Sequence, residues 1–242
     1  MPKVVAIIQA RLGSTRLPEK VLRKIIDRPM LEHVVQRTQR SKNIDSIVVA
    51  TTDQPADQRI VNLCKSNGWN VFTGSENDVL QRYWQCASEL EADYVVRITS
   101  DCPLISPEII DKVVQTSLDS DVDYTCNFHP QRSFPRGLDV ECFPFDVLER
   151  VHHAAIEPNL REHVSLMIYC RPDLFKVKGI SCPIDLSDWR WTVDTADDLQ
   201  MIRKIFEHFG NNHFNWRQAA NAFHENPMWK KINQHIEQKK AA

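Results

Sequence analysis

The chain has 242 residues, of which 42% are hydrophobic and 26% are charged, and its formal net charge at pH 7 is -2. This length and composition exclude a disordered or fibrous protein and are sufficient for one large α/β domain with a small lobe. A net charge this close to zero excludes a global attraction for nucleic acid or an anionic membrane, so any bound polyanion needs a local cluster of cations. We therefore expect neither a nucleic-acid nor a membrane partner.

The start of the chain and its cysteines predict a cytoplasmic protein. The apolar run of residues 4–8 is too short for the core of a signal peptide, and no stretch is long enough to span a membrane. Seven cysteines are scattered without CxxC spacing. This is typical of buried, reduced thiols, with zinc binding or disulfides as the alternative.

Short apolar runs alternate with helical patterns through the first half of the chain. Strands are expected over residues 4–9, 46–52, 71–74, 94–99 and 124–127. Helices are expected over residues 29–40, 56–67, 78–90 and 107–118. Strands that alternate with single helices require right-handed crossovers and a mostly parallel sheet covered on both faces, so the pattern predicts an α/β fold.

The second half of the chain is less regular. After Phe128, strands are expected over residues 138–143, 175–180 and 191–193, and helices over residues 145–155, 161–169 and 196–209. We interpret residues 1–210 as one domain, in which residues 129–189 form an inserted lid or substrate lobe. Residues 211–242 predict an amphipathic helical tail that frays at its Lys-rich end.

A basic, glycine-containing loop follows the first strand. Ligands of an open parallel sheet bind beyond the carboxyl ends of its strands, and this end carries Arg11, Arg16 and Lys20. Gly13 allows the backbone to approach a ligand closely, and Ser14 adds donors for phosphate oxygens. The spacing is neither that of a Walker A loop nor that of a GxGxxG turn. The loop predicts a phosphate site, with a surface loop of solvated arginines as the alternative.

Two aspartates follow expected strands. Asp101 comes after the strand at 94–99, and Asp194 comes after the strand at 191–193. Two carboxylates can hold Mg²⁺ through oxygen ligands while the metal also bridges substrate phosphates. Alternatively, Asp101 is a turn residue and Asp194 caps the following helix.

These residues resemble a known family. Residues 7–18, IIQARLGSTRLP, are similar to the signature opening of the cytidylyltransferase superfamily, which includes the synthetases of CMP-sialic acid and CMP-Kdo. The likeness is closer to the branch of spore coat polysaccharide biosynthesis proteins F. That likeness rests on residues 74–80 (GSENDVL), 97–105 (RITSDCPLI), 137–141 (GLDVE), 161–164 (REHV) and 190–195 (RWTVDT). It runs in order from residue 4 to about residue 209.

The resemblance implies a Rossmann-like GT-A nucleotide-diphospho-sugar transferase fold, CTP as co-substrate and a Mg²⁺ ion held by Asp101 and Asp194. Related enzymes pair through the lid region, so we expect a homodimer. The residues expected to act in catalysis are Arg11, Arg16, Lys20 and Asp101. The residues expected at the nucleotide are Ala10, Arg11, Gly13, Ser14, Thr52, Ser75, Asp78 and Thr99.

The sequence departs from the family at two positions. Glu19 stands where the family usually has glycine before the loop lysine, so its side chain has to point away from phosphate. Thr99 stands where the Kdo enzymes carry glutamine. Recognition of the base and of the acceptor therefore cannot simply be copied from the Kdo branch.

The expected reaction is in-line attack by a sugar oxygen on the α-phosphorus of CTP, with release of pyrophosphate, in surface polysaccharide or glycan synthesis. Such chemistry depends on positioning and charge neutralisation and needs no covalent nucleophile. The expected acceptor contacts are Arg136, Asp139, Glu141, Arg161, Glu162, His163 and Arg190. For a sugar acid, Arg136, Arg161 or Arg190 could hold the carboxylate with two parallel hydrogen bonds, whereas salt bridges within the lobe are the alternative for each.

Two other functions fit parts of the pattern. One is a GT-A glycosyltransferase that uses a preformed nucleotide sugar, although Asp101-Cys102-Pro103 lacks the second aspartate of a DxD motif. The other is a noncatalytic subunit that binds sugar nucleotides, against which the loop cations and both aspartates argue.

Overall fold

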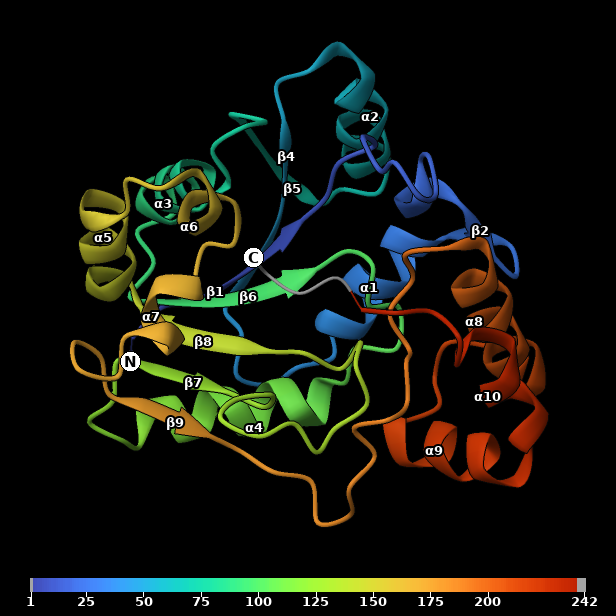
Figure 1. Cartoon of the computed structure of the whole chain (residues 1–242). Coiled ribbons are helices and arrows are strands. Elements are labelled where there is room, and N and C mark those ends of the chain that lie inside the picture. The colour runs from blue at the N-terminus through green and yellow to red at the C-terminus, as the bar shows by residue number, and fades with distance from the viewer. Residues whose placement is uncertain (1, 239–242) are drawn as a thin grey trace.

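The structure, a computed structural model of the chain, describes residues 2–238. The Lys-rich end of the expected tail, residues 239–242, lies outside the described residues. A seven-stranded sheet runs through the molecule in the order β5-β4-β1-β6-β8-β7-β9, with helices on both of its faces (Figure 1). A second, two-stranded sheet is formed by β2 (Lys24–Ile25) and β3 (Arg28–Pro29).

One half of the large sheet is parallel. It consists of β1 (Val4–Gln9), β4 (Ser46–Thr52), β5 (Asn70–Gly74) and β6 (Tyr94–Thr99). On β1, Val5 and Ile7 belong to one core cluster, whereas Ala6 and Ile8 belong to the other. A central strand that is buried on both faces has to be apolar throughout. The predicted strands and the mostly parallel sheet are confirmed.

The other half of the sheet contains antiparallel pairs. It consists of β7 (Tyr124–Cys126), β8 (Glu141–Pro144) and β9 (Val177–Gly179). β8 is antiparallel to both β6 and β7, and β9 is parallel to β7. Residues 129–189, interpreted as an inserted lobe, thus contribute two strands to the central sheet, and their action as a lid stays a prediction.

Helices cover both faces of the sheet. One core cluster contains residues of α1 (Met30–Thr38), α2 (Gln58–Ser66), α4 (Pro107–Leu118), α8 (Ala196–Phe209) and α9 (Trp216–Glu225). The other contains residues of α3 (Val79–Glu89), α5 (Phe145–Ala154) and α7 (Leu166–Cys170). Shorter elements are η1 (Lys20–Leu22), η2 (Pro55–Asp57), α6 (Pro158–Glu162) and α10 (Pro227–Asn233).

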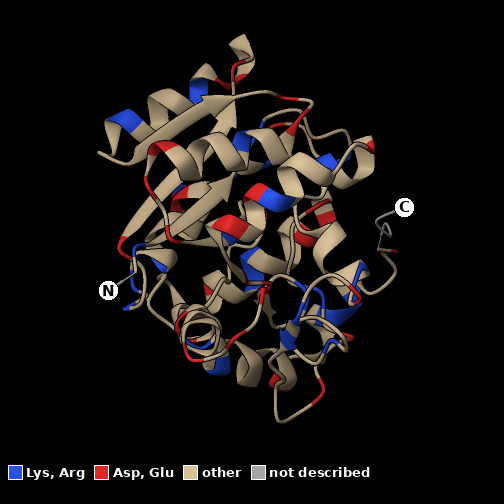
Figure 2. Ribbon diagram, turned by 90° about the vertical axis from the view of Figure 1, so that its left-hand side faces the viewer, with Lys and Arg blue, Asp and Glu red and all other residues tan. Residues whose placement is uncertain are grey.

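Basic and acidic residues are mixed over the molecule, and its cysteines are unpaired. Figure 2 shows Lys and Arg (blue) interspersed with Asp and Glu (red) over the ribbon. All seven cysteines are free thiols, and only Cys170 is exposed. Within residues 2–238, no helix combines the length and the apolar character needed to cross a membrane.

The single helix predicted over residues 161–169 is wrong. α6 ends at Glu162, and α7 begins only at Leu166. Between them, Val164 has φ 51°, a left-handed conformation that interrupts a right-handed helix. The neighbouring hydroxyl of Ser165 donates a hydrogen bond to Glu141. A tertiary contact therefore breaks the helical run.

The strand predicted over residues 191–193 is also wrong. The N–H of Trp191 donates to the carbonyl of Arg136 at 2.7 Å, and the N–H of Val193 donates to the carbonyl of Asp101 at 2.9 Å. These hydrogen bonds hold the segment against two loops, and the sheet contains no strand there. The segment instead carries Asp194 to the end of β6.

Candidate active site

The loop after β1 is fixed to the body of the protein. The N–H of Leu12 donates to the carboxylate of Asp57 at 2.7 Å, and the carbonyl of Leu12 accepts from the N–H groups of Ser14 (2.7 Å) and Glu19 (3.3 Å). The side chains of Leu12 and Leu17 are buried in the core. This anchoring distinguishes the loop from a freely solvated surface loop.

Thr52 supports this loop from outside, and Glu19 lies within it in a left-handed conformation. The buried hydroxyl of Thr52 donates to the second oxygen of Asp57, the residue whose first oxygen fixes the loop. Thr52, which we expected at the nucleotide, therefore orients Asp57. Glu19 has φ 57°, a conformation that glycine adopts at little cost. Its carboxylate pairs with Arg59 and lies outside the lining of the cavity described next.

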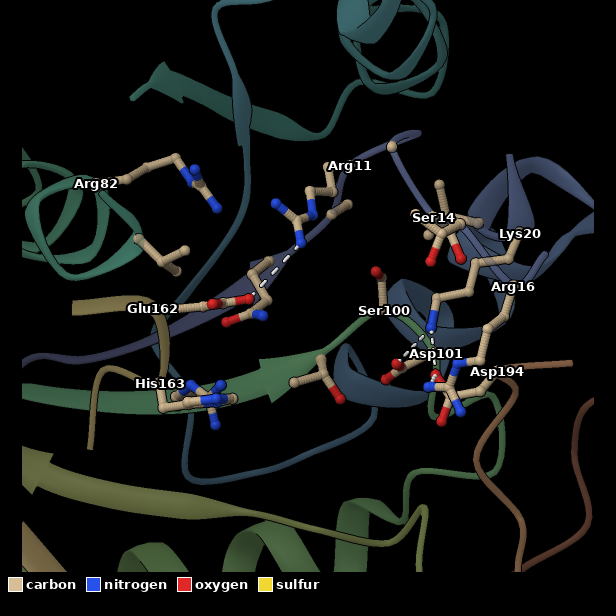
Figure 3. Close-up of a pocket in the computed structure, with 18 residues that line it drawn as sticks. Arg11, Ser14, Arg16, Lys20, Arg82, Ser100, Asp101, Glu162, His163 and Asp194 are labelled. Atoms are coloured by element: carbon tan, nitrogen blue, oxygen red, sulfur yellow. Dashed lines mark hydrogen bonds and ion pairs between the residues drawn. The ribbon is translucent and has the colours of Figure 1, made fainter. Parts of the chain in front are cut away.

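A cavity of about 350 Å³ lies between this loop and the carboxyl end of β6 (Figure 3). The predicted site residues that line it are Ala10, Arg11, Gly13, Ser14, Arg16, Lys20, Thr99, Asp101, Glu162, His163 and Asp194. The fold thus brings the loop cations and both aspartates, which are far apart in the sequence, to one place.

Lys20 lies between the two aspartates. Its Nζ donates to Oδ2 of Asp101 at 2.7 Å, to Oδ1 of Asp194 at 2.9 Å and to the carbonyl of Val193 at 3.0 Å (Figure 3). Arg16 also lies against Asp194, with Nη2 3.0 Å from Oδ1. The carboxylates of Asp101 and Asp194 therefore both contact the ammonium of Lys20 at the end of β6.

This contact changes the protonation behaviour of both partners. Burial alone would lower the pKa of Lys20, but the charges of Asp101 and Asp194 outweigh it and raise the pKa. Burial alone would raise the pKa of Asp101, but the charge and hydrogen bond of Lys20 lower it. At neutral pH the lysine is therefore an ammonium and Asp101 a carboxylate.

Asp194 is held from its other side by Arg190. Nη2 of Arg190 lies 2.8 Å from Oδ2 of Asp194, and Nε lies 2.8 Å from the buried carboxylate of Asp198. Asp198 and Thr195 form the capping box of α8, so Thr195, not Asp194, caps this helix. The side chain of Asp194 stays available to the cavity, and Arg190 acts on it from outside both cavities.

A larger cavity of about 830 Å³ adjoins the first. The predicted acceptor residues that line it are Arg136, Asp139, Glu141, Glu162 and His163. The residues that line both cavities are Arg16, Arg97, Thr99, Asp101, Glu162, His163 and Asp194. The two cavities therefore meet at the aspartates.

Two arginines in the larger cavity differ in their partners. Arg132 pairs with Asp139 through two hydrogen bonds, one of them 2.8 Å long. The side chain of Arg136 makes no hydrogen bond or ion pair with any residue in the described part of the chain, and burial together with the nearby charge of Arg132 lowers its pKa. Arg136 is therefore a cation that an anionic group of a ligand can neutralise.

Three further predicted residues lie together outside both cavities. Asp78 caps α3, where one carboxylate oxygen accepts from the N–H of Gln81 at 2.8 Å. Its other oxygen is 2.7 Å from Nε of Arg161. The hydroxyl of Ser75 accepts from the N–H of Asp78 at 3.1 Å. These contacts join α6 to the start of α3, beside Val79 of the smaller cavity.

Sequence reasoning missed Arg97 and Arg82. Arg97 on β6 lines both cavities and pairs with the buried carboxylate of Glu141, which also accepts from Tyr124 at 2.8 Å. Arg82 on α3 lines the smaller cavity. A basic residue inside the apolar strand YVVRIT was a usable signal, because a buried charge requires a partner. Arg82 had no comparable signal.

The carboxylates fit a magnesium ion better than a transition metal. The described residues contain no group of three or more His, Cys, Asp or Glu side chains that could hold a metal. Zinc sites use three or four such ligands. Mg²⁺ commonly uses one or two carboxylates, keeps several waters and takes the remaining oxygens from substrate phosphates. Asp101 and Asp194 supply such a pair.

The sequence is similar to that of one protein family over most of its length. A family model described as cytidylyltransferase matches residues 5–232. An uncharacterized protein of Methanocaldococcus jannaschii is 41% identical over 239 residues, covering 98% of this chain and 97% of that protein. The spore coat polysaccharide biosynthesis protein SpsF of Bacillus subtilis is 33% identical over 217 residues, covering 87% and 89%.

A solved structure of a cytidylyltransferase has the same fold as this chain. The structure of a cytidylyltransferase from Leptospira borgpetersenii superimposes with a TM-score of 0.92 at 33% identity. The match covers 99% of this chain and 100% of the Leptospira chain. The match therefore includes the elements of this chain that surround both cavities.

Proposed function

Since the chain belongs to the cytidylyltransferase family, we propose that it transfers CMP from CTP to a sugar or sugar acid, with release of pyrophosphate, in the synthesis of a surface polysaccharide or glycan. The observation that carries this proposal is the shared wall of the two cavities at Asp101 and Asp194. A nucleotide in the smaller cavity and an acceptor in the larger one would meet at these carboxylates.

The loop cations bind and orient the triphosphate. Arg11, Arg16 and Lys20 line the smaller cavity, where they neutralise phosphate charge before and during the reaction. In doing so Lys20 moves from the carboxylates to the phosphates. A Mg²⁺ ion held by Asp101 and Asp194 would supply Lewis-acid stabilisation of the charge on the α-phosphoryl group.

The residues of the larger cavity orient the acceptor for in-line attack. Arg136 offers an unneutralised guanidinium to an anionic group, and Asp139 accepts hydrogen bonds from hydroxyls. His163 lines both cavities, and its pKa is lowered mainly by burial. At neutral pH its imidazole is uncharged and can accept the proton that the attacking hydroxyl loses.

Pyrophosphate release with each of the four nucleoside triphosphates, Mg²⁺ and a panel of acceptors tests the proposal. We expect release with CTP and an octulosonate, a nonulosonate or a neutral sugar, and not with CTP alone. The proposal is wrong if no acceptor gives pyrophosphate from CTP while a nucleotide sugar gives free nucleoside diphosphate. That result would identify a glycosyltransferase.

We also propose that the protein works as a homodimer in the cytoplasm, where CTP is available. Light scattering of the purified protein is expected to give twice the 28.1 kDa mass of one chain. A mass of one chain at the concentration of the activity assay would contradict the dimer and leave the proposed reaction unaffected.

A further inference from the structure

The chain returns to the active site after its last helix. α10 ends at Asn233, and the segment that follows turns back from α10 towards the carboxyl end of β6 (Figure 1). We call residues 233–238 the strap. Its last residue, Gln238, lines the larger cavity together with Asp101 and Asp194.

Asn233 anchors the strap. This residue is 2% exposed, and its Nδ2 donates to the carbonyl of Arg190 and to Oδ1 of Asp198, each at 2.9 Å. Asp198 is fully buried and accepts, through Oδ2, the N–H groups of Asp194 and Thr195 at 3.0 Å. The strap is therefore bonded to the turn that presents Asp194 to the cavity.

Gln238 is bonded to the same arginine. Nη1 of Arg190 donates to its side-chain oxygen, while Nη2 and Nε of that arginine contact Asp194 and Asp198. Each of the three guanidinium nitrogens thus has a partner, and the strap supplies one of them. The amide of Gln238 is held at the cavity wall, where it can exchange hydrogen bonds with a polar ligand.

We infer that the strap is a positioning element of the active site, in which Asn233 and Gln238 fix Arg190 and Asp194 and Gln238 contacts the acceptor. The part of this inference that concerns the acceptor rests on the proposed function. Gln238 lines the larger cavity and is absent from the lining of the smaller one. Its loss should therefore affect acceptor binding more than CTP binding.

Gln238→Ala and Gln234→Ala form a matched pair for the kinetic test. Gln234 is exposed, lies in the same segment and lines neither cavity. We expect Gln238→Ala to raise the KM for the acceptor about fivefold to tenfold, the effect of one lost hydrogen bond, with the KM for CTP within about twofold of the wild type. Equal acceptor KM values in the two variants overturn the inference.

Hydrogen exchange tests the anchoring without turnover. In Asn233→Ala, Asp198 loses a hydrogen bond that fixes it, so the amides of Asp194 and Thr195 should exchange at least about tenfold faster than in the wild type. Gln234→Ala should leave their exchange unchanged. Wild-type rates at both amides in Asn233→Ala overturn the anchoring.

The two measurements also separate the strap from the proposed function. If the wild type releases no pyrophosphate with any acceptor, the proposed function fails, and exchange at Asp194 and Thr195 still decides whether the strap positions this turn. If the wild type is active and Gln238→Ala behaves like Gln234→Ala, the strap inference fails alone.

Discussion

Asp101→Asn is expected to lower kcat for pyrophosphate release by about a thousandfold, or roughly 4 kcal/mol of transition-state stabilisation. Asparagine keeps the size of the side chain but removes the negative charge with which the proposed site would hold Mg²⁺ at the shared wall of the cavities. The rate is measured with CTP and acceptor saturating, over a range of Mg²⁺ concentrations. Thermal unfolding checks that the variant is folded, and a modest fall in Tm is expected because Lys20 loses the charge of Asp101 but keeps its contacts with Asp194 and the carbonyl of Val193.

Asp53→Asn is the matched control for this prediction. Asp53 directly follows β4, much as Asp101 follows β6, but it is exposed and lines neither cavity. Its kcat should stay within about twofold of the wild type. A wild-type kcat in Asp101→Asn would remove this carboxylate from the reaction.

Lys20→Met is expected to lower kcat/KM for CTP by about a hundredfold to a thousandfold. The ammonium is lost as the proposed phosphate contact, and Asp101 and Asp194 are left without the cation that lies between them. In metal-free buffer the free energy of unfolding should also fall, by about 2 kcal/mol at neutral pH, because a partly buried pair is broken. Urea denaturation measures this change.

The stability loss in Lys20→Met should depend on pH. The contact lowers the pKa of Asp101, so the contribution of this carboxylate is present above about pH 4 and is lost as the pH falls through the lowered pKa. The contact raises the pKa of Lys20, so the contribution of the ammonium is present below about pH 10 and is lost as the pH rises through the raised pKa. The difference between wild type and variant is thus largest between these limits.

Lys24→Met is the control for this series. Lys24 carries the same charge, is exposed and lines neither cavity, so its replacement should change neither CTP kinetics nor stability appreciably. A Lys20→Met variant with the kinetics of Lys24→Met would contradict the proposed phosphate contact.

The sheet was predictable because its central strands are buried on both faces. The expected bounds of the strands at residues 4–9, 46–52 and 94–99 match β1, β4 and β6, since a fully buried parallel strand leaves an uninterrupted apolar run. Asp194 was predicted at the site from a strand at residues 191–193 that the structure lacks, whereas the loop cations and Asp101 were predictable for a related reason. Polar residues that follow such strands must gather at one edge of the sheet.

The remaining features depend on contacts between distant segments, which leave little local pattern. Val164 breaks a helical run because its neighbour Ser165 is held by Glu141. Arg190 was expected at the acceptor, but its guanidinium is committed to Asp194 and Asp198. Gln238 lines the larger cavity at the end of a segment that Asn233 anchors, and no periodicity in the tail indicates either placement.

The shared wall of the two cavities has a consequence for inhibition. Both cavities are lined by Asp101 and Asp194, so one molecule that extended from the smaller cavity into the larger one would pass these carboxylates. Under the proposed function, a compound that joins a cytidine phosphate to the acceptor sugar by a short linker would occupy both cavities at once, and its second half would bind at the high effective concentration that the linker imposes. Linked bisubstrate analogues are therefore the natural starting point for selective inhibitors of this protein.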